Sequence, residues 1–177
     1  KDEPFEFKNP DIVVSDYIQI PQLNKVISRF ELPGYNNINW EDTHFRLHDS
    51  GLYMPTIPEF MAHFMNVVNC YEGKNKNPLF DPAGNPISNV QLKDIYLHMT
   101  TNHMNQYGAQ NIGTWTWLDA KFKQEQDGLY VLSEHRIQNT NNIKVLSPNK
   151  SEKLESCLME DCFVDLIFNS QHLPTEK

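Results

Sequence analysis

The chain has 177 residues, of which 39% are hydrophobic and 11% aromatic, and its mean hydropathy is -0.58. This length suits one domain with its own core, and the lack of a long apolar run excludes a membrane-spanning helix. The formal net charge of -8, with no cluster of Lys and Arg, argues against a nucleic-acid partner. Three cysteines are too few for a disulfide framework, so we expect a soluble domain with reduced thiols.

The N-terminal part predicts a strand followed by a helix. The run from Asp11 to Ile20 is rich in β-branched residues, which favour a strand. Asn39 can cap a helix that carries Glu41 and Asp42 in its first turn, and Gly51 is a natural C-terminal stop. We therefore expect a first strand near residues 11–20 and a first helix between Asn39 and Gly51.

A second helix is predicted to begin after Thr56, which forms a capping-box pattern with Glu59. Apolar side chains follow at helical spacing, at Phe60, Phe64, Val67, Val68 and Tyr71. Ser88 and Gln91 repeat the capping-box pattern before a third apolar segment, which should end near Asn102. Between these two helices, the segment 81–85 (Asp-Pro-Ala-Gly-Asn) resembles a turn between two short extended pieces.

The final third predicts antiparallel strands. Asp127-Gly128 is typical of a two-residue hairpin turn, and this turn places Lys121 opposite Glu134 and Asp119 opposite Arg136. In that register the apolar residues of the two strands mostly share one face, which supports the pairing. A short further strand is expected at 144–147, whereas the pattern of 157–168 does not decide between helix and strand. The residues expected to build the core are Trp40, Phe60, Phe64, Leu118 and Phe122.

Few residues offer catalytic or metal-binding chemistry. His44 and His48 are four apart on a predicted helix and could bind a metal, but Phe45 stands where a zinc-protease motif needs Glu. G-x-S-x-G, P-loop and G-x-G-x-x-G motifs are absent. We expect no catalytic residue, no metal and no cofactor. The alternative is an enzyme of unrecognised class that uses His44, His48 and Asp49 in a cleft.

Two tryptophans give the best indication of a binding surface. Trp115, Trp117 and Asp119 stand at every second position, so they would share one face of a strand. Aromatic side chains on an exposed strand face could form a platform for a ligand. The alternative is that other elements cover both indoles, since tryptophan is mostly buried in folded proteins.

Several short blocks follow one another in a fixed order along the chain, from about Leu32 to Thr175. They are Leu32-Pro-Gly-Tyr35, Trp40-Glu-Asp-Thr-His44, Leu52-Tyr-Met-Pro-Thr-Ile-Pro-Glu-Phe60, Trp117-Leu-Asp-Ala-Lys-Phe122, Cys157-Leu-Met-Glu-Asp161 and Leu173-Pro-Thr175. Taken together and in this order, the blocks resemble one family, the variable proteins of archaeal diversity-generating retroelements.

The resemblance implies a single α+β domain over residues 1–177 with a divergent C-type-lectin-like fold. Its N-terminal strand and two or three helices would be followed by antiparallel strands. In that family the domain is a non-enzymatic scaffold, and massive sequence variation in a C-terminal segment diversifies its ligand-binding surface. That segment would follow Leu173-Pro-Thr175, so we expect residues 1–177 to lack it. The calcium-site motifs of C-type lectins are absent, so no calcium is expected.

The resemblance also bears on partners and location. The ligand would be a protein or a cell-surface molecule of unknown identity, and display on a cell or virion surface is compatible with such a role. Oligomeric state is not encoded in a recognisable pattern. A further alternative is a self-assembling surface or virion structural protein that binds copies of itself.

Overall fold

The computed structural model describes residues 13–35, 38–100, 103–104, 110–111, 116–141 and 143–154. These residues form α-helices and antiparallel strand pairs, which confirms the predicted α+β class. The chain divides into two compact units, the first formed by Lys1–Tyr53 with Glu59–Trp117 and the second by Met54–Pro58 with Leu118–Lys177. Among the described residues, no helix is long and apolar enough to cross a membrane.

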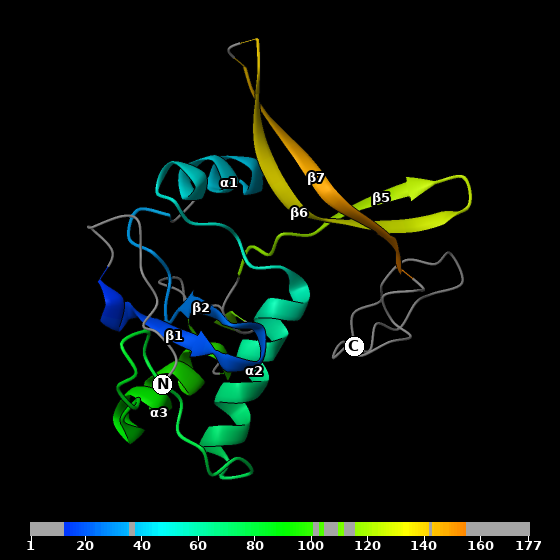
Figure 1. Ribbon diagram of the computed structural model, residues 1–177. Coiled ribbons are helices and arrows are strands. Elements are labelled where there is room, and N and C mark those ends of the chain that lie inside the picture. The colour runs from blue at the N-terminus through cyan, green and yellow to red at the C-terminus, as the bar shows by residue number, and fades with distance from the viewer. Residues whose placement is uncertain are drawn as a thin grey trace. The chain divides into compact units, whose positions relative to one another are not determined.

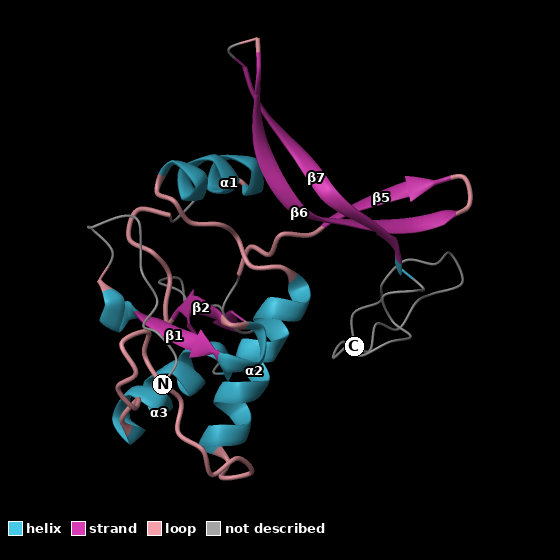
Figure 2. Cartoon of the chain, viewed as in Figure 1, coloured by secondary structure: helices cyan, strands magenta, loops and turns pink. Residues whose placement is uncertain are grey.

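The helices belong mainly to the first unit (Figures 1 and 2). Strands β1 and β2 pair with each other antiparallel, as do the short strands β3 and β4. In chain order the elements are a 3-10 turn at Val14–Asp16, β1 at Tyr17–Ile20, a 3-10 turn at Pro21–Leu23, β2 at Lys25–Ser28, α1 at Trp40–Asp49, α2 at Ile57–Tyr71, α3 at Asn89–Thr100, β3 at His103–Met104 and β4 at Gln110–Asn111.

The first strand is shorter than predicted and has a partner that the sequence did not reveal. Within the predicted range, Tyr17–Ile20 forms β1, Val14–Asp16 forms a 3-10 turn, and residues 11–12 lie outside the described residues. The chain then reverses through Asn24, whose φ of 49° is left-handed, and β2 follows. Strand β2 has four residues, of which only two are β-branched. So short a run does not predict a strand.

The structure confirms the predicted N-terminal caps of α1 and α3. The Asn39 side chain accepts a hydrogen bond from the Asp42 amide at 2.8 Å, so α1 begins where expected. Helix α2 begins at Ile57, directly after Thr56. At the start of α3, the Gln91 amide donates to the Ser88 hydroxyl and the Ser88 amide donates to the Gln91 side chain, which is a complete capping box.

The first unit has an aliphatic core. The short hairpin around the predicted 81–85 turn lies against β1, because the Gln19 amide donates to the Phe80 carbonyl at 2.9 Å. The hairpin, β1, α2 and α3 all contribute buried side chains. These side chains are Ile18, Val67, Leu79, Ile87, Leu92 and Ile95.

The second unit contains β5 (Lys121–Glu125), β6 (Gly128–Thr140) and β7 (Ile143–Lys153), paired antiparallel in the order β5-β6-β7. Strand β5 pairs only with the first part of β6, between Gly128 and Leu132. Strand β7, which extends the strand predicted at 144–147, follows β6 to its end. Figure 1 shows the resulting long ribbon of β6 and β7, with β5 beside one end of it.

The predicted hairpin exists, but its predicted register is wrong by two residues. Lys121 pairs with Leu132 instead of Glu134, and Asp119 lies before β5 instead of opposite Arg136. The turn consists of Gln126-Asp127, and Gly128 is already the first residue of β6. A shift of two residues preserves which residues share a face, so the predicted faces remain compatible with the structure.

Side-chain contacts explain the position of the turn. Asp127 accepts a hydrogen bond from the Tyr130 hydroxyl at 2.9 Å and forms an ion pair with Lys153 of β7 at 3.3 Å. These contacts hold Asp127 at the corner of the turn. Neither contact can be predicted from the Asp-Gly dipeptide alone.

The predicted core was too aromatic. Phe122 is 47% exposed, because β5 lies at the edge of its sheet and all its residues are exposed. Trp40, Phe60, Phe64 and Leu118 are half-buried.

Candidate functional site

The structure describes two of the three residues predicted to bind a ligand. Trp115 lies outside the described residues. Trp117 and Asp119 precede β5 instead of lying within it, so the predicted strand face begins later, at Lys121. Trp117 is 51% exposed, whereas Asp119 is 3% exposed. The two residues therefore have different environments.

Trp117 is both exposed and held in place. Its indole N–H donates a hydrogen bond to the carbonyl oxygen of Ile38, at 3.1 Å. This bond joins two segments of the first unit that are 79 positions apart in the sequence. The polar edge of the ring is therefore satisfied, while about half of the side chain remains available for contact.

Asp119 holds His135 of β6 through both of its carboxylate oxygens. Oδ2 accepts a hydrogen bond from the His135 backbone amide at 2.9 Å, and Oδ1 lies 2.5 Å from Nδ1 of the ring. Both side chains are 3% exposed. Because the carboxylate is an acceptor, the His135 ring carries a proton on Nδ1 in this pair. The pair fixes both the backbone and the ring orientation of His135.

The backbone next to this pair is strained. Glu134 has a φ of 55°, a left-handed conformation that non-glycine residues rarely adopt and that costs about 1 to 2 kcal/mol. On the other side, the Arg136 guanidinium donates to the His135 carbonyl at 3.1 Å. We call Asp119, Glu134, His135 and Arg136 the His135 cluster. The sequence placed Asp119 near Arg136 but gave no sign of the contact with His135.

The residues of the enzyme alternative do not assemble with one another. His44 of α1 is buried and lies edge-on to the Trp40 ring, with 4.3 Å between the ring centroids. His48 and Asp49 are exposed. In the part of the chain that the structure describes, His44, His48 and Asp49 do not form a set of converging metal ligands.

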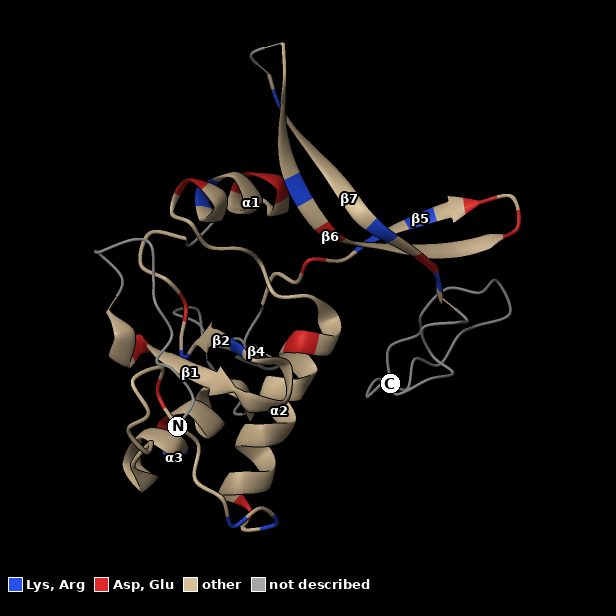
Figure 3. Ribbon diagram, in the orientation of Figure 1, with Lys and Arg blue, Asp and Glu red and all other residues tan. Residues whose placement is uncertain are grey.

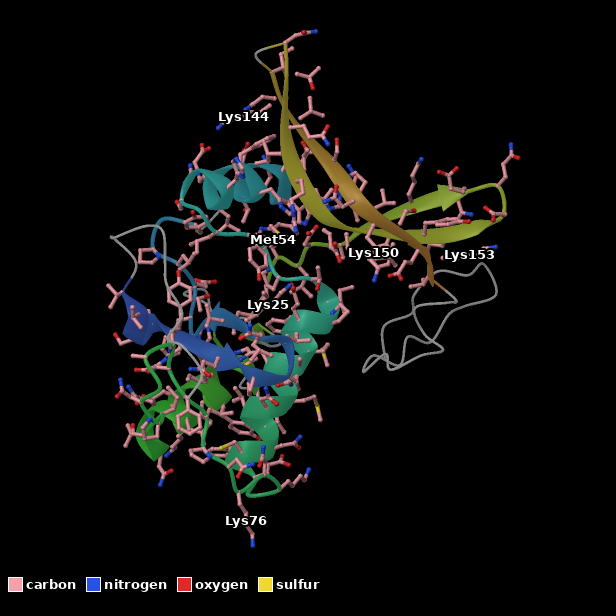
Figure 4. The ribbon with its side chains drawn as sticks, in the orientation of Figure 1. Lys25, Met54, Lys76, Lys144, Lys150 and Lys153 are labelled. Atoms are coloured by element: carbon pink, nitrogen blue, oxygen red, sulfur yellow. The ribbon has the colours of Figure 1, made fainter. Side chains whose placement is uncertain are left out.

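A polar group that the sequence did not reveal joins β2 to α2. The Lys25 ammonium forms an ion pair with the buried carboxylate of Glu59 and lies 5.4 Å from the centroid of the Tyr53 ring. Figure 4 labels Lys25. Burial by itself would lower the pKa of Lys25, but the hydrogen bond and charge of Glu59 raise it above its usual value. One helical turn after Glu59, burial lowers the pKa of His63 to about 4.

Charges are unevenly distributed along the strands of the second unit. Acidic residues lie at the end of β5, at Glu125, and in the turn that follows, at Asp127, whereas the stretch from Arg136 to Ser147 contains only Arg136 and Lys144 as charged residues. Figure 3 shows the distal part of the ribbon as mostly uncharged. In this stretch Ile143 is 65% exposed and Val145 41%. The end of the ribbon is thus weakly basic and partly apolar.

A scan against protein-family models, a search of curated proteins and a search of solved structures each found no match. The features that bear on function are therefore those of the chain itself, the fixed indole of Trp117 and the His135 cluster.

Proposed function

We propose that this chain is a non-enzymatic recognition module of the retroelement variable-protein class, with a divergent C-type-lectin-like fold. The observation that carries the recognition role is the indole of Trp117, which is half exposed although a hydrogen bond to Ile38 fixes it. The retroelement assignment rests on the ordered sequence blocks from Leu32 to Thr175.

A fixed, exposed indole is well suited to binding. Tryptophan is enriched among the residues that dominate binding energies, since its large ring buries much area at little cost in side-chain entropy. The Ile38 bond already restricts the Trp117 ring before a ligand arrives, which lowers that cost further. Suitable partners are proteins or cell-surface molecules that offer an apolar face or a cation to the ring.

Substitution of Trp117 tests this role. The labelled protein is applied to printed arrays of purified cell-surface proteins and oligosaccharides, and dissociation constants are measured for each bound species. Trp117→Ala should weaken binding at least tenfold, equivalent to about 1.4 kcal/mol. Phe122→Ala is the matched control, because Phe122 is a similarly exposed aromatic residue on β5. Equal affinities of the wild type and Trp117→Ala for every bound species would contradict the proposal.

The retroelement assignment has a separate test. The coding sequence downstream of Lys177 is compared among isolates. Substitutions concentrated at adenine-templated codons would support diversification, whereas an invariant sequence would contradict it. This result is independent of the Trp117 binding test, so the two parts of the proposal can fail separately.

A further inference from the structure

In the part of the chain that the structure describes, strand β6 has one unpaired edge over much of its length. Strand β5 accompanies it only as far as Leu132, while β7 continues beside it to Thr140. Among the described residues, no strand pairs with the other side of β6 beyond Leu132. Such an edge presents backbone donors and acceptors that can pair with another chain.

The partner of His135 on β7 shows which backbone groups face this edge. His135 is opposite Pro148, which has no N–H to offer the ladder. The His135 amide points away from β7, towards the open edge, since it donates to Asp119. Alternate residues of a strand direct their backbone groups to the same side, so those of Ile137 and Asn139 also face the open edge.

Side chains occupy both outward backbone groups of His135. Asp119 accepts from its N–H, and Arg136 donates to its C=O. The stretch that remains open thus begins at Ile137 and ends at Asn139, about half the length of an ordinary strand of five or six residues. With His135 included, the open stretch would reach ordinary strand length.

The opposite edge of the ribbon is blocked at the same level. Pro148 of β7 is the pairing partner of His135 of β6, and a proline on an outer strand removes a donor from the outer edge of that strand. Lys144, Lys150 and Lys153 also lie along β7 (Figure 4), and lysines on edge strands disfavour pairing with another chain. Asp119 at one edge of the ribbon and Pro148 at the other therefore each take away a backbone N–H that could pair with another chain.

We propose that Asp119 takes the place of a neighbouring strand at His135, and that this contact prevents β6 from pairing with β6 of a second copy. The edge is self-complementary, because an antiparallel pair about a twofold axis at Ile137 has no like charges opposite each other. In that pair Ile137 meets its own copy, His135 meets Asn139, Arg136 meets Gln138 and Glu134 meets Thr140.

Sedimentation velocity over a range of protein concentrations tests the proposal. The wild type should show no association through this edge, and Asp119→Ala should form a dimer whose fraction rises with concentration. Asp119→Asn is the matched control, because its amide oxygen can still accept from the His135 amide, so it should associate much less than Asp119→Ala. Far-UV circular dichroism checks that each variant is folded.

A second substitution locates the interface. Ile137→Pro in the Asp119→Ala background removes an N–H that faces the open edge and leaves the bonds to β7 in place. The double variant should return to the wild-type sedimentation profile. A folded Asp119→Ala that behaves like the wild type, or a dimer that Ile137→Pro does not weaken, would overturn the proposal.

Hydrogen exchange in the wild type gives a measurement that does not depend on the folding of a variant. The His135 amide should exchange slowly, because Asp119 binds it, whereas the amides of Ile137 and Asn139 should exchange at least tenfold faster. Exchange of His135 as fast as that of Ile137 would overturn the proposal even if Asp119→Ala failed to fold.

Discussion

At the scale of single residues, His63 shows how burial alone can make stability depend on pH. This side chain of α2 is 3% exposed, and burial lowers its pKa from 6.5 to about 4. The folded state therefore holds the neutral ring, while the unfolded state takes up a proton below pH 6.5. Stability should be unaffected by His63 above that pH, fall as the pH decreases towards about 4, and then level off.

The His63 effect can be measured by comparing the wild type with His63→Gln, which cannot titrate. Between pH 7 and pH 5 the wild type should lose about 2 kcal/mol more of its unfolding free energy than the variant. Urea unfolding at the two pH values gives both losses, and contributions from other groups cancel in the difference. Identical losses in the two proteins would show that His63 does not have the lowered pKa.

Residues with local signals were predictable, and residues with distant partners were not. Asn39 and Ser88 cap their helices through contacts within three residues, so the sequence alone reveals them. The contact of Asp119 with His135 joins positions 16 apart, and it depends on a strand register that was predicted two residues away from the observed one. Trp117 was identified as a candidate, but its bond to Ile38 has no local signature.

At the scale of elements, the C-terminal end of α1 depends on one glycine. The Leu52 amide donates to the Leu47 carbonyl at 2.7 Å and the Gly51 amide donates to the His48 carbonyl at 2.9 Å, which together form a Schellman motif. Gly51 has the left-handed φ of 72° that this motif requires. No neighbouring atom lies within 4 Å of the position a Cβ would take, so a side chain here would be opposed by the backbone conformation alone.

Gly51→Ala should therefore lower the unfolding free energy by about 1 kcal/mol. Gly51→Asn is the matched control, and its loss should be smaller because asparagine enters the left-handed region more readily than alanine. Urea unfolding followed by far-UV circular dichroism measures both values. If alanine were tolerated as well as asparagine, the helix end would not depend on this conformation.

The same contrast between local and distant contacts applies to whole elements. Helices α1, α2 and α3 could be predicted, because their caps and apolar spacing lie within one segment. Strand β2 could not be predicted, since its four residues form too short a pattern and it is the antiparallel pairing with β1 that makes them a strand. In the β5–β6 hairpin, Lys153 of β7 binds Asp127 at the turn, so a third strand contributes to a feature that the hairpin sequence alone cannot determine.

At the scale of the whole molecule, the composition indicated a folded domain but not which side chains fill its core. Large aromatic residues were expected to dominate, yet the buried cluster of the first unit is aliphatic. Ile18 and Ile95 are fully buried, whereas Phe122 is 47% exposed. Among the described aromatic residues Tyr17 is buried and the others are at least partly exposed, and an exposed one such as Trp117 is available for contact with a partner.

Substitution of Ile95 tests whether this aliphatic cluster stabilises the fold. Ile95 of α3 is 0% exposed and packs with Ile18, Val67 and Leu92. Ile95→Ala should cost about 2 to 5 kcal/mol, because it removes buried methyl groups and leaves a cavity that the neighbours fill only in part.

The matched control is Val90→Ala on the same helix, where the side chain is 71% exposed. Its effect should stay within about 0.5 kcal/mol, since little apolar area is buried there and alanine favours the helix. Urea unfolding followed by tryptophan fluorescence and by far-UV circular dichroism gives both free energies. Equal losses for the two variants would mean that α3 is not anchored through Ile95, and that the stability of this unit comes from contacts other than its aliphatic cluster.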